Sequence, residues 1–253
     1  MWPIAIVGHL TPGWEDTGEI ADRLGRFFEG LAEVDPMFSR WVRAGTRRHH
    51  SVVPASVTIP PEQTELRSWV DESRIFGSRE GRKKTVGYSL RALTPEQNPI
   101  LADFWLSYEL GEWWFGRRMG ITISSGAASS SPLDDPSNSP ALITFLRAVL
   151  STVGSAWDCD WAGVSPGDYR SASERSPNAQ LAKYQSGWMV YLDPATATSI
   201  VRPQDIAVES LPNGGMLLIA TPHTMFNRHN NDHWAAALRI QAALAPLNAA
   251  HSE

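Results

Sequence analysis

Three of the seven histidines of this chain lie in one short segment, HTMFNRHNNDHW (residues 223–234). A zinc site on a helix needs two histidines four positions apart, so that both face the same way, and a third ligand. His229 and His233 have that spacing, but the glutamate of the H-E-x-x-H motif is absent. The Asn230–Asn231 pair between them favours a helix N-cap, and the apolar pattern of a helix begins only at Trp234. We therefore expect the helix to start between the two histidines, which separates them and gives no metal site.

A second candidate is the sequence WDCDW (residues 157–161), in which Asp158 and Asp160 are two positions apart. Alternate residues of a strand share one face, so both carboxylates could hold Mg²⁺. The competing interpretation puts both carboxylates on an outer polar face, with the two tryptophans and the cysteine pointing inward. We favour this second interpretation. The alternative is a metal-dependent hydrolase or transferase that uses Asp158, Asp160 and His233.

Other catalytic signatures are missing. The sequence has no G-x-S-x-G motif, no P-loop and no dinucleotide-binding glycine pattern. Two basic runs, Arg47–His50 and Ser78–Thr85, could touch phosphate, but basic loops on an acidic protein are typical of solvated surface. Cys159 lies on an apolar, tryptophan-rich segment and is expected in the core. We expect no enzymatic activity and no cofactor.

Charge and composition bear on the class of partner. The formal net charge is −5, which favours a basic partner and gives no overall attraction for nucleic acid. Eleven tryptophans can fill a core or anchor a partner. The single cysteine excludes an internal disulfide. The start, MWPIAIVGHL, has neither the basic residues of a signal peptide nor the length of a membrane span, so we expect a cytoplasmic protein without a membrane partner.

The elements that position these residues follow from periodicity and from Pro and Gly signals. Helices are expected over residues Glu15–Val34, Glu62–Ile75, Ala141–Val153, Asn178–Tyr184 and Asp232–Leu244. Strands are expected over Pro3–Gly8, Ser51–Ile59, Val86–Leu93, Trp113–Ser124, Trp157–Val164 and Trp188–Leu192, with a hairpin around Asn213–Gly215. The predicted class is α+β, with a mixed or largely antiparallel sheet flanked by amphipathic helices.

The segment from Ser124 to Pro140 is rich in Ser, Pro, Gly and Asp, which is typical of a flexible connection. We expect one domain over residues 1–253 with a sub-division at this loop. The order helix, strand, helix, strand, strand occurs on both sides of it, which leaves open two similar αβαββ halves.

Several segments occur together in a recognisable order. Residues 13–42 combine an acidic helix start, the motif A-x-R-L, an aromatic face, D-P and a final R-W. They are followed by VGYSL (86–90), WDCDWAGV (157–164), SGWMVYLD (186–193) and HNNDHWAAALRIQAAL (229–244). Together these segments resemble immunity protein family 52 of bacterial polymorphic toxin systems. The chain departs from the family pattern at residues 9–14, where HLTPGW replaces an expected Y-W-G-P-R, and at Asp232, which replaces a proline.

The resemblance implies a non-enzymatic protein that binds and neutralises a cognate toxin encoded beside it. In this family the toxin is typically a restriction-endonuclease-like nuclease delivered between bacteria, for example by type VI secretion. The chain would occlude the active site or the substrate surface of the toxin, and the histidine at the start of the last helix implies no metal. An adaptor of a secretion system would share this chemistry. Candidate toxin contacts are the carboxylates Glu109, Glu112, Asp134, Asp135, Asp158 and Asp160 and the anchors Trp14, Trp113 and Trp114.

Overall fold

The computed structural model describes residues 3–10, 16–43, 56–58, 62–79, 82–95, 100–109, 117–125, 139–167, 183–227 and 229–250. One antiparallel sheet contains every described strand. The strands are β1 (Ile4–Leu10), β2 (Arg40–Arg43), β3 (Ser56–Thr58), β4 (Arg74–Arg79), β5 (Arg82–Leu93), β6 (Ile100–Glu109), β7 (Arg117–Ser125), β8 (Cys159–Pro166), β9 (Met189–Leu192), β10 (Ala207–Ser210) and β11 (Met216–Ile219). Their order is β10-β11-β9-β8-β1-β7-β6-β5-β2-β3, and β4 pairs with β5.

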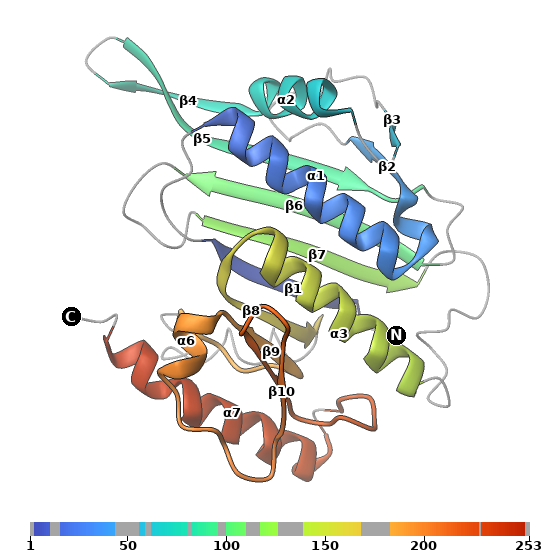
Figure 1. Ribbon diagram of the computed structural model, residues 1–253, viewed down its shortest axis with the longest axis vertical. Helices are drawn as coiled ribbons and strands as arrows, with labels where there is room; N and C mark the ends of the chain where they lie inside the picture. Colours follow the sequence, from blue (N-terminus) through green and yellow to red (C-terminus); the bar gives the residue numbers. More distant parts are fainter. Residues whose placement is uncertain are drawn as a thin grey trace.

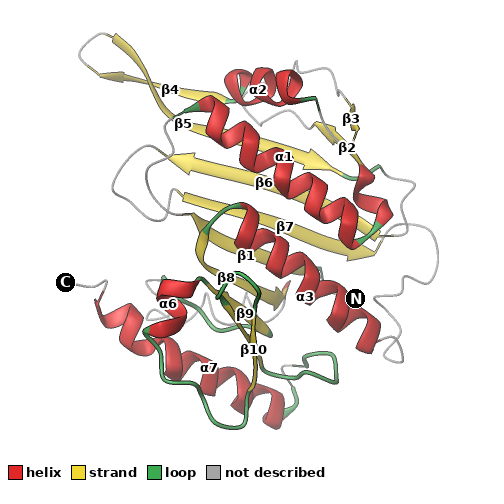
Figure 2. Cartoon of the chain, viewed as in Figure 1, coloured by secondary structure: helices red, strands yellow, loops and turns green. Residues whose placement is uncertain are grey.

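The helices are α1 (Thr17–Val34), α2 (Gln63–Glu72), α3 (Ser139–Ala156), α6 (Pro194–Thr198) and α7 (Asn231–Ala250), with a 3₁₀ turn η1 (Pro36–Ser39). α1, α2 and α3 lie across the same face of the sheet (Figures 1 and 2). The predicted class, α+β with a largely antiparallel sheet, is confirmed. Among the described residues, no helix combines the length and the apolar character needed to cross a bilayer.

Strand β1 joins the two parts of the chain. It pairs with β7 on one side and with β8 on the other, both antiparallel. Strands from before and after the Ser-rich segment are therefore neighbours in one sheet, and residues from both parts share one hydrophobic core.

Helix α1 shows how local sequence and packing agree. The Asp16 side chain caps its start by accepting a hydrogen bond from the Gly18 amide at 2.9 Å. The apolar residues recur every three to four positions and are fully buried against the sheet, ending with Phe27, Phe28 and Leu31. Asp35 terminates the helix, and its side chain then caps the following 3₁₀ turn.

The two parts of the chain share an element order but not a strand pairing. α1-β2-β3-α2-β4-β5 and α3-β8-β9-α6-β10-β11 both read helix, two strands, helix, two strands. In the first part β2 pairs with β5. In the second part it is β9, the counterpart of β3, that pairs with β11. Similar element order is therefore not matched by similar topology.

The predicted basic loop at Ser78–Thr85 is wrong, because its described residues lie in the β4–β5 hairpin, with Ser78 paired to Lys83. The predicted second helix also ends early, since Arg74 and Ile75 already belong to β4. Backbone ladder bonds do not depend on side-chain polarity, so a charged sequence can still form paired strands. The helix expected at 178–184 falls largely outside the described residues.

Strand β6 was missed altogether, although its sequence carries the signal of a half-buried strand. Ala102, Phe104, Leu106 and Tyr108 are buried and the residues between them are partly exposed. That alternation of period two is the pattern expected of a strand with one covered face.

Candidate functional site

The histidine segment is a capped helix start, as predicted. Helix α7 begins at Asn231, so His229 lies before it and His233 within its first turn. The Asn230 side chain accepts hydrogen bonds from the amides of Asp232 at 2.9 Å and His233 at 3.4 Å. The two histidines therefore do not share a helix face.

Both ring nitrogens of His233 face the loop that precedes α7. Nδ1 accepts a hydrogen bond from the Asn227 amide at 3.0 Å, and Nε2 lies 3.4 Å from the Thr224 hydroxyl oxygen. His233 thus fixes the approach of the chain to the helix. Within the described parts of the chain, no three His, Cys, Asp or Glu residues are grouped as a metal site would require.

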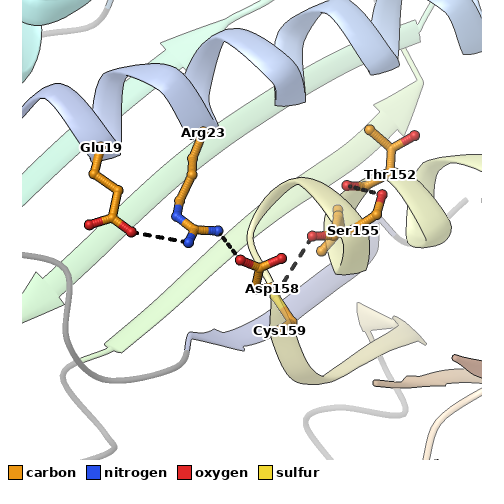
Figure 3. A network of polar contacts seen from close by, with 7 residues as sticks. Glu19, Arg23, Thr152, Ser155, Asp158 and Cys159 are labelled. Carbon is orange, nitrogen blue, oxygen red and sulfur yellow. Dashed lines mark hydrogen bonds and ion pairs between the residues drawn. The ribbon is translucent and has the colours of Figure 1, made fainter. Parts of the chain in front are cut away.

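Asp158 does not lie on a strand. Its φ of 44° places it in the left-handed region, in the turn between α3 and β8, which Asp tolerates better than most residues. The expectation that Asp158 and Asp160 share one strand face is wrong for this reason. The Asp158 carboxylate forms an ion pair with Arg23 of α1 (Figure 3).

Asp160 lies on β8 and is engaged by a different cation. Its carboxylate forms an ion pair with Lys183, and the Tyr184 hydroxyl donates a hydrogen bond to Oδ2 at 3.4 Å. Burial and the nearby Asp160 carboxylate raise the pKa of Tyr184, which keeps the phenol protonated as the donor. The two carboxylates of the D-x-D sequence are thus bound to separate partners.

Cys159 is fully buried, as predicted for a core residue. Burial, with the adjacent Asp160 and Asp158 carboxylates, raises the pKa of its thiol well above the usual value. A protonated, buried thiol is a poor nucleophile.

The other predicted toxin contacts lie where the structure gives no side-chain description. Glu109 is the last residue of β6, but its side chain is not described. The remaining ones are outside the described residues: Trp14, Glu112, Trp113, Trp114, Asp134 and Asp135. Of the predicted set, only the side chains of Asp158 and Asp160 have a described position, at the junction of α3 and β8.

An open groove of about 640 Å³ lies beside this junction, between α1 and α3. Its walls include Arg26, Gly30 and Glu33 from α1, and its α3 wall is uncharged, with Ala148, Thr152 and Ser155. The helices touch at Gly30, because a Cβ added there would lie 2.8 Å from the Thr152 methyl carbon. Sequence reasoning missed this groove, although the charged face of the 15–34 helix was visible in its periodicity.

Arg23 connects the groove to Asp158. It is largely buried, and its guanidinium reaches both Asp158 and Glu19, which lies 3.2 Å away one turn earlier on α1. Figure 3 shows the three side chains in line, with Ser155 and Thr152 close by on α3. A buried arginine held between two partly exposed carboxylates fixes their positions.

On β1 lies a buried titratable group, His9, which is 4% exposed. Its ring meets that of Trp161 edge-on at 5.0 Å. Burial, and then the positive charges of Arg118 and Lys183, lower the pKa of His9 well below its ordinary value of 6.5.

Acidification below about pH 6.5 is therefore expected to destabilise the protein. In that range the unfolded chain binds a proton at His9 that the folded chain does not, so this site alone reduces the free energy of unfolding by up to about 1.4 kcal/mol per pH unit, until the folded-state pKa is reached. Urea denaturation between pH 5 and 7.5 measures this, with His9→Phe expected to flatten the profile and the exposed His229→Gln expected to retain it. The same slope in His9→Phe and in the parent protein would show that His9 is not the group responsible.

Comparison with known proteins identifies a relationship in the second part of the chain. Residues 139–250 match the family model of Immunity protein 52. This match runs from α3 to the end of α7 and includes the segments at 157–164, 186–193 and 229–244. The segments at 13–42 and 86–90 lie outside it.

Two further comparisons are less informative. No curated protein is significantly similar to the chain. The Pseudomonas aeruginosa T6SS protein PA0821 is similar in structure, with a TM-score of 0.48 and 11% sequence identity over 96% of this chain and 73% of that chain. Similarity at this level is too low to indicate a shared function.

Proposed function

We propose that this chain is an immunity protein that binds a cognate antibacterial toxin and neutralises it without catalysing a reaction. The observation that carries the proposal is the match of residues 139–250 to Immunity protein 52. We further propose that the toxin is a nuclease delivered between bacteria and that the chain blocks its active site or its substrate surface. A nuclease needs a basic surface for phosphate, which suits a chain with a net charge of −5.

The arrangement of the polar residues supports binding rather than metal chemistry. A hydrolase built on Asp158, Asp160 and His233 would need their side chains to converge on one point. Instead Asp158 binds Arg23, Asp160 binds Lys183, and the His233 ring faces the loop before α7. The metal-dependent alternative therefore has no assembled ligand set among these three residues.

Co-purification tests the proposal. The tagged chain is co-expressed with the protein encoded beside its gene, with that toxin's active site inactivated so that the cells survive. A complex that persists through size-exclusion chromatography is expected, with a Kd on the order of 1 nM or lower, equivalent to about −12 kcal/mol. An unrelated basic nuclease serves as the control and should not co-purify. If the neighbouring protein is toxic when active but does not associate with the chain, the proposal is wrong.

A further inference from the structure

We propose that the groove between α1 and α3 is the toxin-docking surface, and that its occupant is a segment of the toxin bearing lysine or arginine side chains. This inference rests on the proposed immunity function and specifies the surface that performs it. The shape of the groove, the charge of its α1 wall and the carboxylates at its end each support it.

The shape of the groove admits a protein segment. The opening between the helices measures about 640 Å³, a volume within the range of sites that hold large ligands. On the α3 side the lining side chains are small, and Ser155 is exposed. Small side chains allow another backbone to come close to the helix, and a partner there would bury the contact between Gly30 and Thr152.

The charge of the α1 wall is complementary to a basic occupant. Glu19, Asp22, Glu29 and Glu33 lie on the solvent side of α1, with Arg26 as the exposed basic residue among them. The opposite helix does not balance this charge, because its one charged residue, Arg147, already forms an ion pair with Glu209. A basic segment in the groove would therefore meet excess negative charge, which favours both association rate and orientation.

The Glu19–Arg23–Asp158 cluster adds ordered acceptors at the end of the same surface. The side chains of Glu19 and Asp158 are 43% and 60% exposed, and both are held by the nearly buried Arg23. Two carboxylates share one guanidinium, so the cluster keeps a net charge of about −1. Because Arg23 orders them before binding, an incoming cation meets side chains that lose little conformational freedom.

Binding measurements with matched variants test the docking surface. The probe is the inactivated protein encoded beside the gene, and its affinity is measured by calorimetry in 50 mM and 200 mM salt. Glu33→Lys reverses a charge on the wall of the groove, and Ser155→Trp fills the groove. Each is expected to weaken binding by about tenfold or more, as loss of a central contact does, and Glu33→Lys is expected to reduce the salt dependence.

The controls place the same changes away from the groove. Glu65→Lys reverses an exposed carboxylate on α2, and Ser199→Trp enlarges an exposed serine that, like Ser155, donates to the carbonyl four residues earlier. Both should bind within about twofold of the parent chain, a difference of under about 0.5 kcal/mol. Should Glu33→Lys prove unstable, Glu33→Gln replaces it and is expected to weaken binding less, in the same direction.

The outcomes separate the two proposals. If the parent chain binds the toxin and the groove variants bind equally well, or if Glu65→Lys weakens binding as much as Glu33→Lys, the docking surface is elsewhere and the immunity function stands. If the parent chain does not bind, the immunity proposal fails and this inference fails with it. A self-associating chain whose dimer is broken by Ser155→Trp would overturn the inference by making the groove a contact between two copies.

Discussion

Replacing Phe28 by alanine is expected to lower the free energy of unfolding by about 3–5 kcal/mol. Phe28 is fully buried under α1 and lies at the centre of an aromatic cluster. Its ring centroid is 5.1 Å from that of Trp41, 5.6 Å from those of Phe27 and Phe104, and 6.2 Å from that of Trp69. Truncation removes apolar burial and leaves a cavity between α1 and the sheet that rigid rings cannot close.

Urea denaturation followed by tryptophan fluorescence and circular dichroism measures the loss. Leu238 on α7, half exposed, gives the control, since Leu238→Ala should change stability by less than about 0.5 kcal/mol. A domain of ordinary stability has about 5–15 kcal/mol in total, so Phe28→Ala should be close to unfolding. A loss below about 1 kcal/mol would contradict the packing of α1 on the sheet.

Gly154→Ala is expected to destabilise the protein by about 1–3 kcal/mol, the opposite of the usual effect in a helix. In an exposed helix interior, alanine is favoured over glycine by about 1 kcal/mol. A Cβ at Gly154, however, would lie 2.5 Å from carbons of the Tyr191 ring, where α3 packs on β9. The ring has little freedom to move, because it is buried and its hydroxyl accepts a hydrogen bond from Asn213 at 3.2 Å.

The matched control is Gly18→Ala in the first turn of α1. The nearest atoms to a Cβ there are the Asp16 carboxylate oxygens at 3.5 Å, an ordinary contact. Thermal denaturation of both variants should give a lower Tm for Gly154→Ala and an equal or higher Tm for Gly18→Ala. Stabilisation by both changes would show that α3 is not seated on Tyr191.

The helices could be predicted because each combines a periodic apolar face with recognisable ends. α1 and α7 begin where Asp16 and Asn230 act as caps, and both signals are local in sequence. The hairpin around Gly214 was also predictable: this residue has a φ of 84°, a conformation that glycine adopts at little cost.

The features that were missed depend on contacts between distant segments. The charged β4–β5 hairpin is held by backbone pairing that side-chain polarity does not reveal. The position of β1 between β7 and β8 is set by pairing across more than a hundred residues, which no local pattern encodes.

The candidate site was only partly predictable for the same reason. The D-x-D hypothesis treated Asp158 as a strand residue, whereas its left-handed backbone turns it towards Arg23. The acidic residues of α1 were visible in the sequence, but the groove exists only because α1 and α3 meet at Gly30. Which charged residues form a surface is therefore decided by helix packing.

The most direct test of the immunity proposal is a growth assay. The active toxin encoded beside the gene is induced in a susceptible bacterium, with this chain expressed at a matched level or with an empty vector. The proposal predicts that growth is lost with the vector and restored by the chain. Loss of growth in both strains, with the chain folded and abundant, would contradict it.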